Sequence, residues 1–182
     1  NYPVFLYVIS ERANSHPHIF IRCLNILNNM RTLHIIMPMA GEGSRFIKEG
    51  YTQPKPLIEY QGMPLFIRAI NSLKDIDVPR KYSFIVRKEH ITTHQIDQVI
   101  KTNIPSAQIY KVDKTTRGAV ETCLIAKDGI KKDDSILIMD CDLEFYSSNY
   151  NKAIKNIIED PANPTKGLLL SFTSNDPRYS YA

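Results

Sequence analysis

Short apolar runs alternate with helix-like stretches over most of the chain, and this order constrains the fold more than any other feature. Strands are predicted at Leu33–Met37, Ser83–Val86 and Gln108–Val112, with a further strand at Gly167–Phe172. The run Ser135–Met139 is almost entirely apolar, which is typical of a strand at the centre of a sheet. Strands that alternate with helices form a parallel sheet covered on both faces. The sequence therefore predicts an α/β fold that binds ligands at the carboxyl ends of its strands.

The helices are expected between these strands. Apolar spacing predicts helices over residues 64–73, with Pro64 in the first turn, and over residues 89–100. Another helix is predicted to open at Gly118, and a last one to run from Tyr150 to Ile158. The stretch Met39–Gly62 is rich in glycine and proline, so it is predicted to be a long loop rather than a helix.

The length and charge of the chain limit the classes of protein to consider. A chain of 182 residues can bury the core of one domain. Residues 1–29 are interpreted as an extension or the tail of an upstream segment, and residues 30–182 as one domain truncated at its C-terminal end. The net charge of +4 comes without a dense block of Lys and Arg, which argues against a nucleic-acid partner.

Membrane insertion and a disulfide framework are also not expected. The apolar opening run Pro3–Ile9 is too short to span a bilayer, and it lacks the flanks of a signal peptide. The three cysteines, Cys23, Cys123 and Cys141, lie far apart and are odd in number. Reduced thiols in a cytoplasmic protein are the simplest interpretation.

A glycine loop follows the first predicted strand directly. Gly41 and Gly43 allow backbone N–H groups to approach an anion, and the Arg45 guanidinium is a planar fork suited to phosphate oxygens. Such charge-assisted hydrogen bonds contribute about 1.5–3 kcal/mol each. A dinucleotide fingerprint would need glycine in place of Phe46, and a P-loop would need Gly-Lys-Ser/Thr, which is absent. Taken alone, the loop is equally compatible with a turn that binds nothing.

A lysine between two prolines lies about ten residues further along. Pro54 and Pro56 restrict the backbone on both sides of Lys55. This arrangement holds an ammonium group still, which a surface lysine does not need. By itself, the motif is also compatible with a solvated lysine in a proline-rich loop.

Together the two motifs resemble the signature of one family. GEGSRF followed by PKPLIEYQGMPLF is similar to the pattern of nucleotide-sugar pyrophosphorylases, also called sugar-phosphate nucleotidylyltransferases. The resemblance covers roughly residues 33–182, and its details are similar to a bacterial subgroup found with capsule and surface-polysaccharide genes. It implies a Rossmann-like, mostly parallel sheet with helices on both faces, of the nucleotide-diphospho-sugar transferase type.

The resemblance also implies roles for the residues of the motifs. Arg45 and Lys55 would be the catalytic residues, with Lys55 contacting the acceptor phosphate and the reacting centre. Gly118, at the start of a helix, would lie near the nucleobase, although a plain helix cap explains the same glycine. The implied nucleotide-binding residues are Met39, Ala40, Gly41, Gly43, Ser44, Arg45 and Gly118.

A magnesium site is implied at the end of the run that closes at Met139. Asp142 takes the position of the metal-binding aspartate of the family, while Asp140 is a second candidate, a supporting partner or a structural cap. Alternation along a strand would place both carboxylates on the same side. One or two carboxylates plus substrate phosphates is the usual environment of Mg²⁺ in proteins.

The implied activity is the Mg²⁺-dependent transfer of a nucleoside monophosphate from an NTP to a phosphorylated acceptor, a sugar 1-phosphate above all, with release of pyrophosphate. An anionic phosphate nucleophile needs no strong general base, so positioning and charge stabilisation carry the reaction. The five histidines show no metal spacing and are interpreted as structural or surface residues. The second metal carboxylate of the family and much of its acceptor pocket would lie beyond the end of this chain, and Asp176–Tyr179 is a candidate start of the acceptor side.

Three alternatives stay open from the sequence. The first is a cytidylyltransferase that acts on a phosphorylated amino alcohol or a related acceptor, and the second is a non-catalytic nucleotide-binding domain of the same fold. The third is a glycosyltransferase, since Asp140-Cys141-Asp142 mimics an Asp-x-Asp motif. The expected setting is cytoplasmic nucleotide-sugar and polysaccharide biosynthesis, with an NTP and a phosphorylated small molecule as partners. No nucleic acid or membrane is expected as a partner, and a homo-oligomer is compatible with the sequence.

Overall fold

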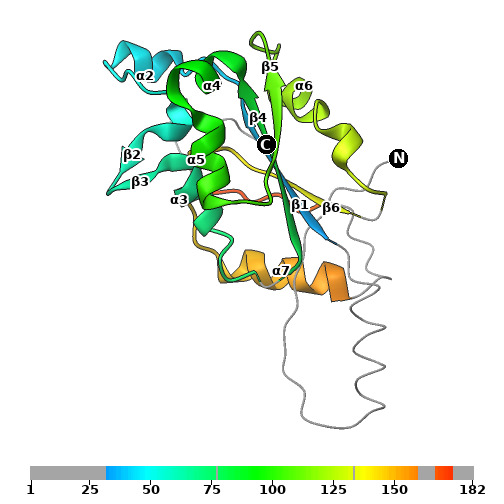
Figure 1. Ribbon diagram of the computed structural model, residues 1–182. Coiled ribbons are helices and arrows are strands. Elements are labelled where there is room, and N and C mark those ends of the chain that lie inside the picture. The colour runs from blue at the N-terminus through cyan, green and yellow to red at the C-terminus, as the bar shows by residue number, and fades with distance from the viewer. Residues whose placement is uncertain (1–31, 77, 133, 160–166, 174–182) are drawn as a thin grey trace.

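Four parallel strands form the main sheet of the protein (Figure 1). The computed structural model describes residues 32–76, 78–132, 134–159 and 167–173. The sheet has the order β5-β4-β1-β6, and a small antiparallel pair, β2–β3, stands apart from it. The strands are β1 (Leu33–Met39), β2 (Glu59–Tyr60), β3 (Met63–Pro64), β4 (Arg80–Arg87), β5 (Gln108–Val112) and β6 (Ser135–Ile138).

The helices come between the strands in the order that the sequence predicts. Figure 1 shows α6 on one side of the sheet, and α3 and α5 on the other. The α-helices are α2 (Ser44–Lys48), α3 (Leu65–Asn71), α4 (Lys88–His94), α5 (Ile96–Asn103), α6 (Ala119–Leu124) and α7 (Ser148–Glu159). Two short 3₁₀ helices, η1 (Lys55–Leu57) and η2 (Lys127–Gly129), complete the described elements. The predicted α/β class with helices on both faces is therefore confirmed.

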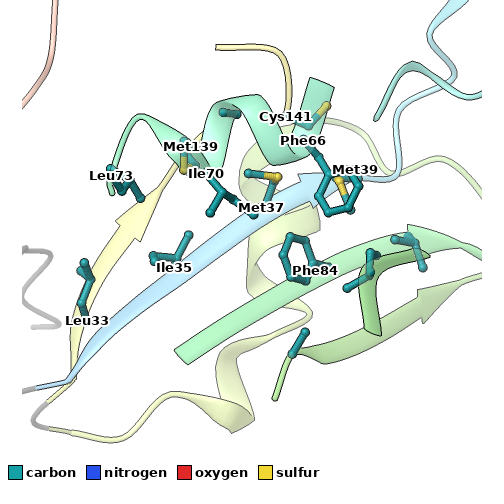
Figure 2. Close-up of a cluster of buried hydrophobic side chains, with 14 of the residues drawn as sticks. Leu33, Ile35, Met37, Met39, Phe66, Ile70, Leu73, Phe84, Met139 and Cys141 are labelled. Atoms are coloured by element: carbon teal, nitrogen blue, oxygen red, sulfur yellow. The ribbon is translucent and has the colours of Figure 1, made fainter. Parts of the chain in front are cut away.

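Alternation along β1 divides the core between the two faces of the sheet. Leu33, Ile35 and Met37 belong to the larger cluster, which α3, α5 and α7 also line. Figure 2 shows part of this cluster, with α3 lying across β1. Ile36 points into the smaller cluster under α6, which includes Cys123. Both faces are thus buried, which is why the strand sequences read as continuous apolar runs.

Among the described strands, β4 and β1 lie inside the sheet and β6 lies at its edge, so the prediction that Ser135–Met139 lies at the centre is wrong. Within the described residues, β1 pairs with β4 on one side and β6 on the other, whereas β6 pairs with β1 alone. Ile138 at the end of β6 is 50% exposed. The run is apolar because Ile136 and Leu137 pack on opposite faces of the sheet, not because strands flank it on both edges.

Residues 89–100 form two helices instead of the single predicted one. Gln95 adopts a left-handed conformation, with φ of 51°, between α4 and α5. This break reorients the chain so that Ile96 and Ile100 both reach the core. The apolar spacing predicted the buried face but gave no sign of the turn.

The predicted long loop over Met39–Gly62 contains short regular elements. A five-residue helix, α2, follows the glycine loop, and η1 begins at Lys55. Pro64 lies in β3 and caps α3 rather than occupying its first turn. Glycine and proline interrupt long elements, but they permit a single helical turn between them.

The predicted fifth strand at Gly167–Phe172 is not a strand within the part of the chain that the structure describes. Leu168 and Leu170 pack against the larger core cluster, whereas Leu169 and Phe172 are 72% and 62% exposed. The segment therefore keeps the alternation that suggested a strand, but it enters no hydrogen-bonded ladder there.

Several predictions fall on parts of the chain outside this description. Residues 1–29, Cys23, His16, His18 and the candidate acceptor segment Asp176–Tyr179 lie outside the described residues, so the division of the chain at residue 30 stays a prediction. Among the helices that are described, none has both the length and the apolar character needed to cross a membrane.

Candidate active site

A pocket of about 1050 Å³ opens beyond the carboxyl ends of β1 and β6. The glycine loop, η1 and the turn after β6 form its walls, so two neighbouring segments meet one that is far away in the sequence. The lining residues are Pro38, Met39, Gly41, Gly43, Ser44, Arg45, Phe46, Lys48, Glu49, Tyr51, Lys55, Pro56, Asp140, Cys141 and Asp142. The pocket therefore lies at the carboxyl ends of the strands, where the sequence predicts ligand binding.

The glycine loop turns sharply at Gly43. This residue has φ of 65° and ψ of 28°, a left-handed conformation that side-chain-bearing residues rarely adopt. A Cβ atom at this position would also lie 3.4 Å from Cβ of Lys55. The left-handed turn into α2 is therefore what favours glycine here, since a Cβ atom would make only an ordinary van der Waals contact with Lys55.

Arg45 stands in the first turn of α2 and lines the pocket. Its side chain is exposed, and it has no ion pair among the described residues. The α2 helix buries none of its residues, so it presents this arginine rather than contributing to the core. A permanently charged guanidinium that lines a pocket and makes no ion pair with the described residues is suited to bind an anion.

Lys55 is held by its neighbours and points at a carboxylate. Pro56 and Leu57 are buried within η1, which fixes the backbone of the lysine. The Nζ atom of Lys55 lies 2.7 Å from Oδ2 of Asp142 and 5.8 Å from the centroid of the Phe46 ring. The two charged side chains are 30% and 35% exposed, and ion pairs of this exposure contribute only about 0–1 kcal/mol. The lysine can therefore exchange partners at little cost.

Asp140 and Asp142 both line the pocket, but not for the predicted reason. Strand β6 ends at Ile138, so neither aspartate belongs to a strand. Burial nevertheless alternates beyond it: Met139 and Cys141 are 5% exposed and belong to the core, and the two aspartates are exposed. Figure 2 shows Met139 and Cys141 in the buried cluster beside α3. The anchored neighbours are what turn both carboxylates toward the pocket.

Cys141 is not a candidate nucleophile. Burial raises the pKa of its thiol to about 12. The positive charge of Lys55 acts to lower this pKa, but the negative charges of Asp142 and Asp140 offset it. A thiol with this pKa stays protonated near neutral pH, and the thiolate is the reactive form. The cysteine therefore serves to anchor the turn that carries the aspartates.

The two aspartates suit a hard cation. Within the described residues there is no group of three or more His, Cys, Asp or Glu side chains that could hold a metal ion alone. Mg²⁺, however, is typically bound by one or two carboxylates together with substrate phosphates. A pair of carboxylates in the same pocket as an arginine and a lysine fits that kind of site.

Two of the predicted nucleotide-binding residues do not line this pocket. Ala40 is 1% exposed and packs in the smaller core cluster. Gly118 is exposed and caps the start of α6, as the sequence predicts. Its loop still approaches the glycine loop, because Oγ1 of Thr115 donates a hydrogen bond to Oε1 of Glu42 over 3.4 Å. The segment before Gly118 therefore contacts the glycine loop, while Gly118 itself does not line the pocket.

The sequence analysis missed the aromatic residues of the pocket. The rings of Phe46 and Tyr51 form an edge-on pair with centroids 5.7 Å apart, and Tyr51 is 48% exposed. Phe46 had been considered only as the residue that rules out a dinucleotide fingerprint. An aromatic residue next to a glycine loop carried no recognisable signal without knowledge of the pocket.

A parallel sheet with a pocket at its carboxyl edge defines an α/β domain, and its fold is similar to those of several solved proteins. A protein provisionally named glucose-1-phosphate thymidylyltransferase from Bacillus anthracis, solved with sucrose, matches at 19% identity over 70% of this chain and 50% of its own, with a TM-score of 0.57. The inositol-1-phosphate CTP transferase from T. maritima matches at 16% identity over 71% of this chain and 49% of its own, with a TM-score of 0.54. At these identities the likeness concerns the fold.

A nucleoside-diphosphate-sugar pyrophosphorylase from Vibrio cholerae RC9 shares 30% identity over 65% of this chain and 52% of its own, at a TM-score of 0.48. The similarity of fold therefore rests on the preceding two structures alone. The chain spans about half the length of the solved structures that it matches. No protein-family model matches the chain, and no curated protein does.

Proposed function

We propose that this chain forms the nucleotide-binding part of a nucleotidyltransferase, which transfers NMP from an NTP to a phosphorylated acceptor and releases pyrophosphate. One observation carries the proposal: Asp142, which is far from Arg45 and Lys55 in the sequence, lines the same pocket as these two cations. A single charged motif can arise on any surface. Two cations and a carboxylate that converge at the carboxyl end of a parallel sheet match the needs of a triphosphate and its metal.

The triphosphate would be bound by the glycine loop and Arg45. The loop supplies backbone N–H groups near Gly41 and Gly43, and Arg45 supplies an unpaired guanidinium. Lys55 would bind the phosphate at the reacting centre. Because its ion pair with Asp142 is about one-third exposed on each side, a phosphate oxygen can replace the carboxylate as the partner of Nζ.

Asp142, with Asp140 beside it, would hold Mg²⁺ in the same pocket. The metal would neutralise charge on the phosphate oxygens and help to orient them for an in-line displacement. The ion pair with Lys55 suggests how the roles divide: the Asp142 carboxylate would bind the metal ion, and the Lys55 ammonium would bind the phosphate. The present pair keeps both groups within reach of the same point.

The chemical step needs no general base from the protein. An anionic phosphate oxygen of the acceptor forms a bond to the α-phosphorus, and the bond from that phosphorus to the oxygen that bridges the α- and β-phosphates breaks. Its electron pair leaves with pyrophosphate. The protein's part is to align the two phosphates and stabilise the developing charge. This agrees with a pocket of Arg, Lys and Asp in which the described histidines take no part.

A pyrophosphate-release screen tests this proposal. The whole protein would be given each of four NTPs with Mg²⁺ and either sugar 1-phosphates, phosphorylated amino alcohols or no acceptor. Release with a sugar phosphate alone supports the sugar-phosphate assignment, and release with a phosphorylated amino alcohol supports the cytidylyltransferase alternative. If every mixture is inactive while calorimetry shows NTP binding, the chain is a non-catalytic nucleotide-binding domain.

The finer assignments rest on the sequence resemblance. We propose a sugar 1-phosphate as the acceptor, cytoplasmic nucleotide-sugar biosynthesis as the setting, and surface-polysaccharide formation as the use of the product. The described cysteines, Cys123 and Cys141, are buried and unpaired, which agrees with a reducing compartment. Homo-oligomerisation is a further proposal, which sedimentation of the whole protein would test.

A further inference from the structure

Arg68 lies on α3, outside the pocket, and makes more polar contacts than an exposed helical arginine needs. Its Nε and Nη2 atoms donate to the same oxygen of Glu144, Oε2, over 3.0 and 2.6 Å. Its Nη1 atom donates to the carbonyl oxygen of Tyr60 over 3.3 Å and to Oε1 of Gln61 over 3.4 Å. The guanidinium also lies 4.8 Å from the centroid of the Tyr60 ring. One side chain therefore ties α3 to the β2–β3 turn and to the segment after β6.

The segment after β6 is held to α3 at a second point. The backbone N–H of Phe145 donates to Oγ of Ser72 over 2.9 Å, at the end of the same helix. The Phe145 ring packs edge-on against Tyr150 of α7, with centroids 5.5 Å apart. Residues two and three positions beyond Asp142 are thus anchored, so the carboxylate of Asp142 stands on a fixed stretch of backbone.

The segment that carries Lys55 is supported by the same helix. The first residue of α3, Leu65, donates its backbone N–H to the carbonyl oxygen of Ile58 over 3.0 Å. Ile58 directly follows η1, and η1 packs against α3. The two sides of the Lys55–Asp142 pair, 87 positions apart in sequence number, are therefore aligned by one helix.

We propose that Arg68 is a positioning residue, which fixes Asp142 relative to Lys55 by binding Glu144 and the β2–β3 turn at the same time. The inference rests on the proposed function, because it assigns Arg68 to the metal-binding side of that pocket. Arg68 does not line the pocket, so we assign it no direct contact with substrate or metal. Its planar fork reaches partners on two segments together, which a lysine cannot reproduce.

The test compares Arg68→Ala, Arg68→Lys and Glu144→Gln with Lys74→Ala in the whole protein. Lys74 is exposed and lies three residues beyond the end of α3, so its loss removes the same charge from the same region. Mn²⁺ binding in the presence of NTP would be followed by electron paramagnetic resonance, with pyrophosphate release measured separately as a function of Mg²⁺. Circular dichroism would confirm that each variant folds.

Arg68→Ala should weaken Mn²⁺ binding and raise the Mg²⁺ midpoint about tenfold, the lower range for losing a partner that orients a metal ligand. Arg68→Lys should not restore either value, and Lys74→Ala should match the parent. Glu144→Gln should also weaken Mn²⁺ binding and raise the Mg²⁺ midpoint. The double variant Arg68→Ala/Glu144→Gln should show less than the sum of the two single effects. A loss of stability alone would leave the metal midpoint of the folded fraction unchanged.

Unchanged Mn²⁺ binding in folded Arg68→Ala and Glu144→Gln, with Asp142→Asn defective, would overturn the inference and leave the proposed function intact. Shifted Mn²⁺ binding in a protein that releases no pyrophosphate with any acceptor would support the positioning role and overturn the proposed activity. Normal Mn²⁺ binding in Asp142→Asn would overturn the inference as well, since Arg68 would then be orienting a residue that holds no metal.

Discussion

Both ends of the four-stranded sheet carry ionisable side chains, but these side chains are partly exposed at one end and buried at the other. At the carboxyl end, Lys55 and Asp142 form a single ion pair that is about one-third exposed on each side. At the amino end, His34 is fully buried between Ser83 and Asp134, with Nε2 2.7 Å from the serine oxygen and Nδ1 3.4 Å from the carboxylate. Since a carboxylate only accepts, Nδ1 carries the proton and the serine hydroxyl donates to Nε2.

The amino-end cluster resembles a catalytic triad in composition, but its burial argues for a structural role. Ser83 and His34 are 0% exposed, and Asp134 is 7% exposed. The carboxylate of Asp134 also accepts from Nζ of Lys81 and from the backbone N–H of Lys131. A substrate could not reach a hydroxyl buried in this way. The comparison teaches that satisfied, buried charges hold this fold together, while exposed, exchangeable charges are available for chemistry.

The largest effect is expected at the carboxyl end, from Asp142→Asn. Loss of this charge should lower Mg²⁺-dependent pyrophosphate release by about 10³-fold, at the upper end of the loss for one preorganised charged group. The melting temperature should stay close to that of the parent protein, because the side chain is about one-third exposed. Steady-state rates over a range of Mg²⁺ would measure this. Normal rates in Asp142→Asn with loss in Asp140→Asn would reverse the assignment of the two aspartates.

Arg45→Ala should lower turnover by about 10²–10³-fold, as expected when one charge stabiliser is lost. The arginine is exposed and unpaired among the described residues, so stability should not change. Lys127→Ala, which removes an exposed charge from η2, is the control. Pyrophosphate release at the parent rate in Arg45→Ala would show that the arginine does not serve the triphosphate.

At the amino end the expected effect is on stability. Asp134→Ala should lower the free energy of unfolding by about 2–3 kcal/mol, because buried donors that lose their acceptor cost about 1–3 kcal/mol each. Asp113→Ala provides the control, since that carboxylate pairs with Lys88 at 73% exposure. Urea unfolding measures both. Equal losses of stability in Asp134→Ala and Asp113→Ala would show that the buried carboxylate contributes no more to stability than the exposed one.

Acid should weaken the amino end, and His90, which follows β4 and whose pKa is also lowered by burial, adds a second acid-sensitive group. Burial lowers the pKa of His34, despite its hydrogen bond to Asp134. A depressed histidine pKa contributes stability that is present above the ordinary value of 6.5 and is lost as the pH falls through the folded-state value. Burial raises the pKa of Asp134, but bonds from Lys131 and Lys81 outweigh it, so its net downward shift acts in the same direction at lower pH.

Urea unfolding between pH 5 and pH 8 would measure this dependence, with His34→Gln as the comparison. The parent should lose stability as the pH falls below about 6.5, the ordinary histidine value. The variant should lose less over this interval, because the titrating ring is gone. An equal loss in both proteins would assign the acid sensitivity to other groups.

A small effect on stability is expected from Lys55→Gln. Its ion pair is about one-third exposed, so the free energy of unfolding should change by less than about 1 kcal/mol. Pyrophosphate release should fall sharply in the same variant if Lys55 serves the reacting phosphate. A large loss of stability with unchanged turnover would show that Lys55 has a structural role and not a role in the reaction.

The α/β class, the positions of β1, β4, β5 and β6, and the edge that holds the pocket could be predicted because they depend on local patterns. The strand at Gln108–Val112 has the bounds that the apolar run indicated. The glycine loop and the lysine between prolines were recognisable because unusual backbone requirements restrict residue type. Their convergence with Asp142 in one pocket follows from a parallel sheet, where strand carboxyl ends meet at a common edge.

What the sequence could not supply depends on contacts between distant residues. An apolar run states that both faces of a strand are buried, not how many neighbours pair with it, so Ser135–Ile138 was misplaced at the centre. The break at Gln95 needs one left-handed residue that no composition rule marks. The pairing of Lys55 with Asp142 and the contacts of Arg68 join segments across the fold. Local residue chemistry determined which groups were candidates, and only tertiary packing decided which are buried, which stay exchangeable, and which hold the others in place.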